Sequence, residues 1–319
     1  MPTLQEETMP ENSLAFIFPG QGSQKVGMLA AAHEQFAAVR DTFTEAADAL
    51  DYDMWDLIQN GEQQALNLTE TTQPVLLASS VALWRAWQEQ GGVQPALMAG
   101  HSLGEFSALV CAGSLGFADA LRLVRSRGQF MQTAVPVGEG AMAAIIGLDD
   151  EAINAICAET EGVVAAVNFN SPGQVVIAGH TGPVEVAIAA IKAAGAKRAM
   201  PLPVSAPFHT ELMQPAGERL AEAMADITIN APQVPVVHNV HAATETDPEA
   251  IRALMVKQIY SPVQWTRCIQ TMTNAGVTEL VECGPGKVLS GLNRRIDKAL
   301  NSYSLEEPES LASALQELG

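Results

Sequence analysis

The sequence predicts an α/β fold in which helices cover both faces of a parallel sheet. Short, wholly apolar runs such as residues 14–18 alternate with longer stretches whose apolar residues recur at helical spacing. This alternation is typical of parallel strands joined by helices. Residues 138–204 follow a different order of elements, which indicates a unit inserted into the α/β region.

The first 133 residues contain two predicted core strands separated by helices. LAFIF, residues 14–18, reads as a buried strand that Pro19 stops before a glycine turn, and a helical region follows over roughly residues 27–60. Apolar positions then recur at helical spacing from Val75 to Trp87 and end at Gly91-Gly92. The run ALMAG that follows is predicted to be the second core strand.

Residues 138–204 predict the order strand, helix, strand, strand, helix, strand. This is the split pattern of a ferredoxin-like subdomain. Asp149 is expected to cap the first helix, and Ser171-Pro172-Gly173 to form the turn between the central strands. The six segments are GAMAAIIGL, DDEAINAICAET, GVVAAVNFN, QVVIAGH, TGPVEVAIAAIKAAG and AKRAMPLPV.

The α/β pattern resumes after residue 204. PVVHNV and VTELVECG read as strands, and helices are expected near residues 247–259 and after Gly284-Pro285-Gly286. Residues after 300 are expected to form a polar tail. We therefore divide the chain into a flexible N-terminal tail, residues 1–12, a core built from residues 13–137 and 205–319, and an inserted subdomain, residues 138–204.

Composition excludes several classes of function. The 319-residue chain has a formal net charge of −19, which repels nucleic acid and anionic membrane surfaces. It lacks an apolar run of 18 residues, so no segment is expected to span a membrane, and its acidic start does not resemble a secretory signal. Four cysteines without C-x-x-C spacing predict buried thiols in the cytoplasm and no metal site.

Gly100-His101-Ser102-Leu103-Gly104 matches the G-x-S-x-G pattern between a predicted strand and a predicted helix. In that context a sharp turn exposes the serine hydroxyl, although the pattern alone is a weak signal. Serine also needs an adjacent base and hydrogen-bond donors for the oxyanion. Ser102 is therefore a candidate nucleophile whose partners must come from elsewhere in the chain.

The glycine turn after the first strand does not fit a phosphate-binding loop. Gly20 and Gly22 begin a dinucleotide pattern, but Lys25 stands where its third glycine belongs. Gly22 and Gly27 have the spacing of a nucleoside-triphosphate loop, but Met28 replaces the required lysine. A backbone amide of this turn, that of Gln21, is instead a candidate oxyanion donor beside that of Leu103.

His209 is the best candidate base among the six histidines. It lies in PLPVSAPFHTELM, where prolines restrain the loop before a helix, as a rigidly held base requires. His101 adjoins the serine on a tight turn, where it cannot easily act as the base. The other four, His33, His180, His238 and His241, read as structural or exposed residues.

Arg127 belongs to ALRLVRSRGQF, whose arginines are the only basic residues for some distance in an acidic chain. By spacing alone, these arginines read as solvated side chains of a helix. An arginine in a pocket wall, however, binds a carboxylate through two parallel hydrogen bonds. Both interpretations stay open from the residues alone.

With these residues assembled, the chain resembles the malonyl-coenzyme A:acyl carrier protein transacylases of bacterial type II fatty-acid synthesis. The resemblance covers nearly everything from about residue 14 to 295, in the right order. Besides Arg127, 25 residues after Ser102, it rests on FPGQGSQKVGML, MAGHSLGEFSALVCAG, VNFNSPGQVVIAGH, PLPVSAPFHTELM, QIYSPVQW and ECGPGKVLSGL.

The resemblance implies an α/β-hydrolase-like core with a ferredoxin-like insertion and a role for each matching residue. Ser102 is expected to be the acylated nucleophile, His209 the general acid and base, and Arg127 the ligand of the malonyl carboxylate. Further implied roles are oxyanion donation by the Gln21 and Leu103 amides, orientation of the histidine by the Gln258 main-chain carbonyl, and an acyl pocket formed by His101 and Phe208.

The implied reaction moves a malonyl group from malonyl-CoA to acyl carrier protein without a cofactor. Two rival functions stay open: a serine esterase or thioesterase of the same fold, and a non-catalytic subunit that binds the carrier. Because carrier proteins are acidic, docking needs a local basic patch. We expect it at Lys287, Arg294 and Arg295, joined by Lys197 and Arg198, although these also read as ordinary solvated cations.

Overall fold

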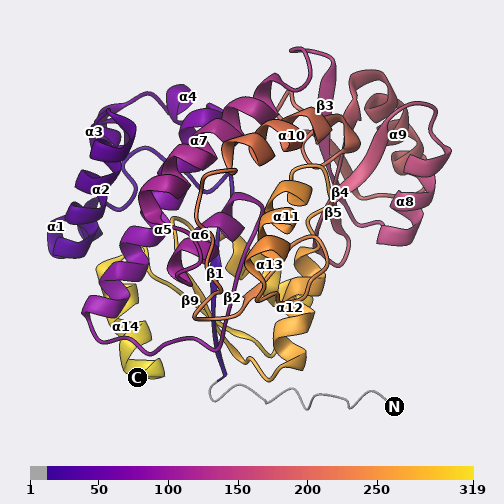
Figure 1. The fold of residues 1–319 in the computed structure, drawn as a ribbon. Helices are drawn as coiled ribbons and strands as arrows, with labels where there is room; N and C mark the ends of the chain where they lie inside the picture. The colour runs from indigo at the N-terminus through magenta and orange to yellow at the C-terminus, as the bar shows by residue number, and fades with distance from the viewer. Residues whose placement is uncertain (1–12) are drawn as a thin grey trace, which may run out of the picture.

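The strand β1 (Leu14–Phe18) lies at the centre of a five-stranded sheet with the order β7-β2-β1-β8-β9. The computed structural model describes residues 13–319, so the predicted tail, residues 1–12, lies outside them. Every neighbouring pair in this sheet is parallel, as the sequence predicts (Figure 1). Its other strands are β2 (Leu97–Gly100), β7 (Val236–Val237), β8 (Glu279–Glu282) and β9 (Asn301–Ser304).

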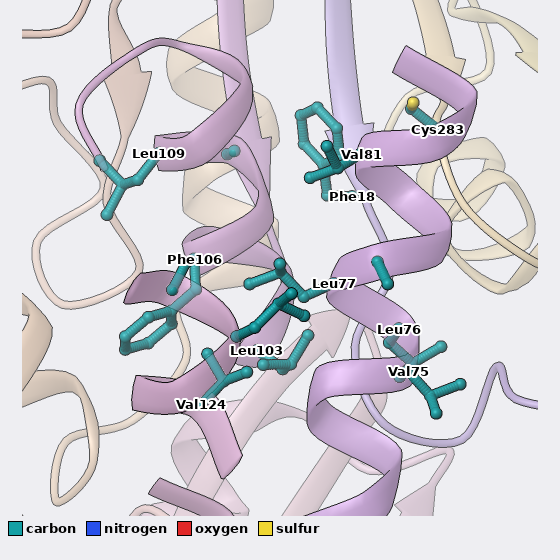
Figure 2. Packing of buried hydrophobic residues seen from close by; sticks show 14 of the residues in the cluster. Phe18, Val75, Leu76, Leu77, Val81, Leu103, Phe106, Leu109, Val124 and Cys283 are labelled. Carbon is teal, nitrogen blue, oxygen red and sulfur yellow. The ribbon is translucent and has the colours of Figure 1, made fainter. Parts of the chain in front are cut away.

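Side chains of β1 alternate between two apolar layers, one on each face of the sheet. Leu14, Phe16 and Phe18 join the larger cluster, whereas Ala15 and Ile17 join the smaller one. Figure 2 shows Phe18 in the larger layer with Leu77 and Val81. Helices with side chains in that layer are α1 (Ala30–Gln35), α2 (Ala37–Leu50), α3 (Met54–Asn60), α4 (Gln63–Leu66), α5 (Thr69–Glu89), α6 (Leu103–Cys111), α7 (Phe117–Thr133), α10 (Gln214–Ala223), α11 (Pro248–Gln258) and α14 (Pro308–Leu318).

The opposite face is covered by α12 (Trp265–Asn274) and α13 (Val288–Ile296), whose apolar residues pack on Ala15 and Ile17. The centre of the sheet is thus buried on both sides, which explains why β1 and β2 read as continuous apolar runs. Among residues 13–319, no helix is long and apolar enough to cross a membrane.

A second, antiparallel sheet has the order β4-β5-β3-β6, and α8 (Asp150–Glu159) and α9 (Thr181–Ala193) pack on one of its faces. Asp149 caps α8 by accepting a 2.8 Å hydrogen bond from the Ala152 amide, as predicted. In Figure 1 this unit lies to one side of the parallel sheet. Its strands are β3 (Gly140–Ile146), β4 (Val164–Ser171), β5 (Gln174–His180) and β6 (Arg198–Pro201).

Main-chain hydrogen bonds join the two sheets. The Val263 amide donates to the Val167 carbonyl at 2.8 Å, and the Phe169 amide donates to the Val263 carbonyl at 3.0 Å. Because Val263 lies two residues before α12 and the other two residues belong to β4, these bonds attach the second sheet to the helical layer of the first.

Three expectations about secondary structure need correction. Residues after 300 are not a polar tail, because β9 pairs with β8 and α14 buries Leu311 and Ala314. The predicted strand PVVHNV is reduced to the two residues of β7, and the helical region near residues 27–60 is divided into α1, α2 and α3. Hydropathy does not reveal β9 because the edge strand NSYS is held chiefly by main-chain hydrogen bonds to β8.

Gly104 allows the first turn of α6 to rest directly on the end of β1. A Cβ atom at this position would lie 2.0 Å from the Phe18 carbonyl oxygen, and one at Gly100 would lie 1.9 Å from the Gly104 carbonyl. Both contacts involve backbone, which cannot move aside cheaply. The two glycines of the G-x-S-x-G pattern therefore set the distance between β1, β2 and α6.

Gly104→Ala is expected to lower the free energy of unfolding by about 1–3 kcal/mol, because the added methyl group overpacks the contact with β1. Gly291→Ala in α13 is the matched control, since nothing lies within 4 Å of a Cβ there. Alanine is the better helix former, so the control should be stabilised by up to about 1 kcal/mol. Urea unfolding of both variants measures the difference; equal effects would contradict this account of Gly104.

Candidate active site

Ser102 lies in the turn between β2 and α6, in the strand-turn-helix context that the sequence predicts. Its backbone has φ 52° and ψ −108°, a conformation that non-glycine residues rarely adopt. Such strain persists only where surrounding contacts impose it, and it is frequent at functional sites.

His209 forms the predicted pair with Ser102. Its Nε2 lies 2.9 Å from the Ser102 Oγ, and its Nδ1 lies 2.9 Å from the Gln258 carbonyl oxygen. Since a carbonyl can only accept, the neutral ring carries its proton on Nδ1. Nε2 is then free to accept the hydrogen of the Ser102 hydroxyl, the arrangement of a serine and its base.

Burial and positive charge keep the His209 ring neutral. Burial is the larger cause and the nearby Arg127 guanidinium the second, and together they lower the His209 pKa to about 3. The carbonyl of Gln258 acts in the opposite direction but does not outweigh them. The imidazole is therefore available as a proton acceptor throughout the neutral range.

Arg127 is buried beside the serine rather than solvated. Only 1% of its surface is exposed, and burial lowers its pKa to about 10, so the guanidinium stays charged at neutral pH. Its Nη2 donates to the Ser102 Oγ at 3.2 Å and to the Gln258 Oε1 at 2.8 Å, and its Nη1 donates to the Gln73 Oε1 at 2.8 Å.

The Arg127 guanidinium also lies over the Phe106 ring, 5.1 Å from its centroid. All of its hydrogen-bond partners among the described residues are neutral, and no carboxylate there forms an ion pair with it. A buried cation in this setting is a strong potential ligand for an incoming anion.

The predicted oxyanion donors line the same cavity as Ser102. The cavity has a volume of about 540 Å³ and includes Gln21, Leu103, Arg127 and His209 in its wall. Within residues 13–319, neither the Gln21 nor the Leu103 amide has a hydrogen-bond acceptor. The Leu103 amide also lies at the start of α6, where the helix dipole favours negative charge.

Phe208 and His101 are placed in the cavity wall, as the acyl-pocket prediction requires. The His101 Nε2 lies 2.8 Å from the Asn170 Oδ1, and burial lowers the His101 pKa. The opposite wall includes Met142 of β3 and Asn168 of β4, so the cavity opens between the two sheets. The predicted basic residues on α13 do not line it.

Sequence analysis missed three buried polar residues around Ser102, Gln73, Glu105 and Asn239, and it described a fourth, His238, only as structural or exposed. Gln73 binds Arg127, and Glu105, His238 and Asn239 form a hydrogen-bonded group behind the serine. The available signals were a glutamine next to Pro74 inside an apolar helix, a glutamate in an apolar helix start, and polar residues directly after a core strand. Each signal also fits an ordinary helix end or loop.

A strained serine, a neutral histidine, two backbone amides and a buried cation thus share one cavity, an arrangement suited to an enzyme that acts through a covalent serine intermediate. A family model described as an acyl transferase domain matches residues 15–313. The chain belongs to this acyl transferase family.

Relatives narrow the comparison. The malonyl CoA-acyl carrier protein transacylase of Escherichia coli strain K12 is 60% identical over 304 residues, which cover 95% of this chain and 98% of the relative. A crystal structure of an acyl carrier protein S-malonyltransferase from Vibrio cholerae is similar with a TM-score of 0.94 and 55% identity, covering 95% of this chain and 100% of that one.

A malonyl-transacylase solved in complex with its type II PKS acyl-carrier protein is similar with a TM-score of 0.94 and 53% identity. The match covers 96% of this chain and 100% of that one. Together with the parallel sheet and its helices, these likenesses confirm the predicted α/β class and the predicted family.

We expect NMR titration of the His209 ring to show it neutral from pH 8 down to about pH 4, whereas a histidine in a peptide titrates near 6.5. Arg127→Met removes one cause of the lowered pKa, so the His209 pKa should rise in this variant. A wild-type midpoint near 6.5, or an unchanged midpoint in Arg127→Met, would contradict this electrostatic account.

Proposed function

We propose that this protein transfers the malonyl group of malonyl-CoA to the phosphopantetheine thiol of acyl carrier protein, through an ester on Ser102. The observation that carries the proposal is the buried Arg127 guanidinium, 3.2 Å from the Ser102 Oγ and bonded only to neutral side chains. A malonyl group esterified to Ser102 brings its free carboxylate within reach of this cation.

In the first half-reaction, the Ser102 Oγ attacks the thioester carbon while its proton passes to the His209 Nε2. The oxyanion accepts hydrogen bonds from the Gln21 and Leu103 amides, and one such donor stabilises the transition state by about 3 kcal/mol. When the intermediate collapses, the carbon–sulfur bond breaks and His209 protonates the coenzyme A thiolate. Malonyl-Ser102 and free coenzyme A are the products.

In the second half-reaction, the carrier's thiol gives its proton to His209, and its sulfur attacks the ester carbon of malonyl-Ser102. The carbon–oxygen bond breaks, and His209 returns the proton to the Ser102 Oγ. The two substrates therefore use the site in turn, as ping-pong kinetics requires. The Gln258 carbonyl keeps the His209 proton on Nδ1 between the two steps.

Selectivity for malonyl is assigned to Arg127 and Phe208. Arg127 binds the carboxylate, and the Phe208 ring beside His209 narrows the space next to the α-carbon of the acyl group. A steric difference of one methyl group contributes only about 1–3 kcal/mol, so discrimination against methylmalonyl is weaker than discrimination against an acyl group without charge.

The esterase alternative fits the site less well. An esterase of this fold orients its histidine with Asp or Glu, whereas the His209 Nδ1 lies against the neutral main-chain carbonyl of Gln258. A buried cation next to the serine also has no purpose in an apolar acyl pocket. The carrier-binding alternative leaves the 2.9 Å contact between Ser102 and His209 without a function.

We also propose a hydrolase-like core, a ferredoxin-like insertion and a location in the cytoplasm. An α/β-hydrolase-like core, residues 13–137 and 205–319, is supported by the serine turn after a central parallel strand. A ferredoxin-like insertion, residues 138–204, is supported by its βαββαβ order and antiparallel sheet. The free thiols of the four cysteines fit a reducing cytoplasm.

Mass spectrometry of the protein mixed with malonyl-CoA tests the function. We expect a malonyl adduct on Ser102 that is stable in water and is removed by holo acyl carrier protein. Rapid hydrolysis of the adduct would support the esterase, and the absence of any adduct would support the binding subunit.

Arg127→Ala should slow malonyl transfer on the order of 100-fold while improving the relative use of acetyl-CoA. An equal loss for both acyl groups would contradict carboxylate recognition.

We also propose that acyl carrier protein docks on a basic patch formed by Lys287, Arg294, Arg295, Lys197 and Arg198. All five are exposed, and the Arg295 Nη1 donates to the Gln174 Oε1 at the start of β5, which brings α13 next to the second sheet. Gly286, next to Lys287, lies close to Ser23, which follows the cavity-lining Gly22 in the glycine turn. The patch opposes the net charge of −19 locally.

Reversing the charge in Arg294→Glu/Arg295→Glu should raise the KM for the carrier several-fold and leave acylation by malonyl-CoA intact, because neither residue lines the cavity. Stopped-flow acylation and steady-state carrier kinetics separate the two steps. Lys192→Glu in α9 is the control: it also replaces a positive side chain by a negative one, at an exposed position outside the patch. An unchanged KM for the carrier in the double variant would contradict the proposal that the carrier docks on this surface.

A further inference from the structure

The carboxylate of Glu105 is buried directly behind the nucleophile turn, where the reaction described above gives it no role. Glu105 and His238 both have 0% of their surface exposed, and the His238 Nδ1 lies 2.8 Å from the Glu105 Oε1. Burying a carboxylate is expensive unless several donors satisfy it. Its donors therefore indicate what this residue holds in place.

The second carboxylate oxygen binds the two residues that hold the backbone of Ser102. The Glu105 Oε2 accepts from the Asn239 amide at 2.9 Å and from the Gln258 Nε2 at 3.0 Å. The Asn239 Oδ1 in turn accepts from the Ser102 amide at 2.8 Å, and the Gln258 Nε2 also donates to the Ser102 carbonyl at 2.9 Å. Both polar backbone groups of the serine are thus satisfied by side chains tied to one carboxylate.

Glu105, together with the Ser102 carbonyl and the Arg127 guanidinium, determines which way the Gln258 side-chain amide faces. A carboxylate accepts only, so the nitrogen of that amide must point toward Glu105 and its oxygen toward Arg127. The main-chain carbonyl of the same residue holds the His209 Nδ1. A reversed amide would place an NH2 group against the guanidinium and an oxygen against the carboxylate, both repulsive.

We propose that Glu105 is a positioning residue: by binding the Asn239 amide and the Gln258 side chain, it supports the hydrogen bonds that hold Ser102 in its strained backbone conformation and in line with His209. Glu105 touches neither substrate nor the reacting atoms, so it acts through Asn239 and Gln258. The inference rests on the proposed role of Ser102 as the nucleophile. Because it concerns the reactivity of the serine itself, it applies to any acyl group.

The test measures how fast phenylmethanesulfonyl fluoride labels Ser102, by mass spectrometry. In this reaction Oγ attacks the sulfur, fluoride leaves and His209 takes the proton, so neither malonyl recognition nor the carrier enters. Glu105→Leu should lower the labelling rate of the folded protein on the order of 10- to 100-fold, since small misplacements of reacting groups have effects of this size. Its kcat for malonyl and acetyl thioesters should fall by one common factor.

Glu105→Gln should retain most of the wild-type rate. Its side-chain oxygen can accept from Asn239 and Gln258 as the carboxylate oxygen does, so the two bonds that lead to Ser102 keep their direction. Only the contact with His238 reverses, because the NH2 group donates to an Nδ1 that donates in the wild type, and the neutral ring then carries its proton on Nε2. A folded but unreactive Glu105→Gln would overturn the proposal in favour of a requirement for the charge.

Glu282→Leu is the matched control. Glu282 is also fully buried, and its carboxylate accepts from the amides of Leu289 and Ser290 at the start of α13, away from Ser102. This variant should lose stability but keep the labelling rate in its folded fraction, measured together with circular dichroism. An equal loss of rate in Glu282→Leu would reduce the effect of Glu105 to general destabilisation.

Asn239→Ala tests the proposal independently should Glu105→Leu fail to fold. It removes the acceptor of the Ser102 amide and leaves the main-chain bond to Glu105 in place, so the labelling rate should again fall at least tenfold. Wild-type labelling in folded Asn239→Ala or Glu105→Leu would overturn the inference. If the wild-type protein itself is not labelled at Ser102, the nucleophile role fails and the inference fails with it, whereas a labelled wild type with equally labelled variants overturns the inference alone.

Discussion

Gln258 is the residue through which the parts of the site are held together. Its main-chain carbonyl binds His209, its side-chain oxygen binds Arg127, and its side-chain nitrogen binds the Ser102 carbonyl and Glu105. Donor and acceptor cannot be exchanged at any of these contacts without creating a buried repulsion. The geometry of the nucleophile, the base and the cation therefore depends on the orientation of one amide at the end of α11.

This arrangement places charge and strain where water is excluded. Arg127 is buried with neutral partners, and both Ser102 and His209 have a positive φ, at 52° and 65°. Each feature costs stability, and the large apolar layer over the parallel sheet offsets that cost. The site is thus organised before a substrate arrives, which is what electrostatic stabilisation of a transition state requires.

The second sheet contributes to the site as a wall rather than as a source of reacting groups. Met142 and Asn168 line the cavity opposite Ser102, and the bonds through Val263 hold β4 against the layer of α12. The cavity is therefore lined by residues of both sheets and of the glycine turn, and it can surround an acyl group on Ser102.

The sequence by itself determined the features that depend on local patterns. Apolar runs predicted the core strands, helical spacing predicted the main helices, and the order of elements in residues 138–204 indicated a unit that differs from the parallel sheet. Ser102 could be selected by its motif, and His209 by its proline-rich loop. The roles of Arg127 and Gln258 followed only from resemblance to a family, because their spacing alone equally fits a solvated helix.

Only the tertiary structure decided the burial of Arg127 and its pairing with Gln73. It also revealed the group formed by Glu105, His238 and Asn239, and the polar edge strand β9. The physical reason is common to all of these features. Each depends on hydrogen bonds between segments far apart in the chain, and such bonds leave no periodic pattern in the sequence.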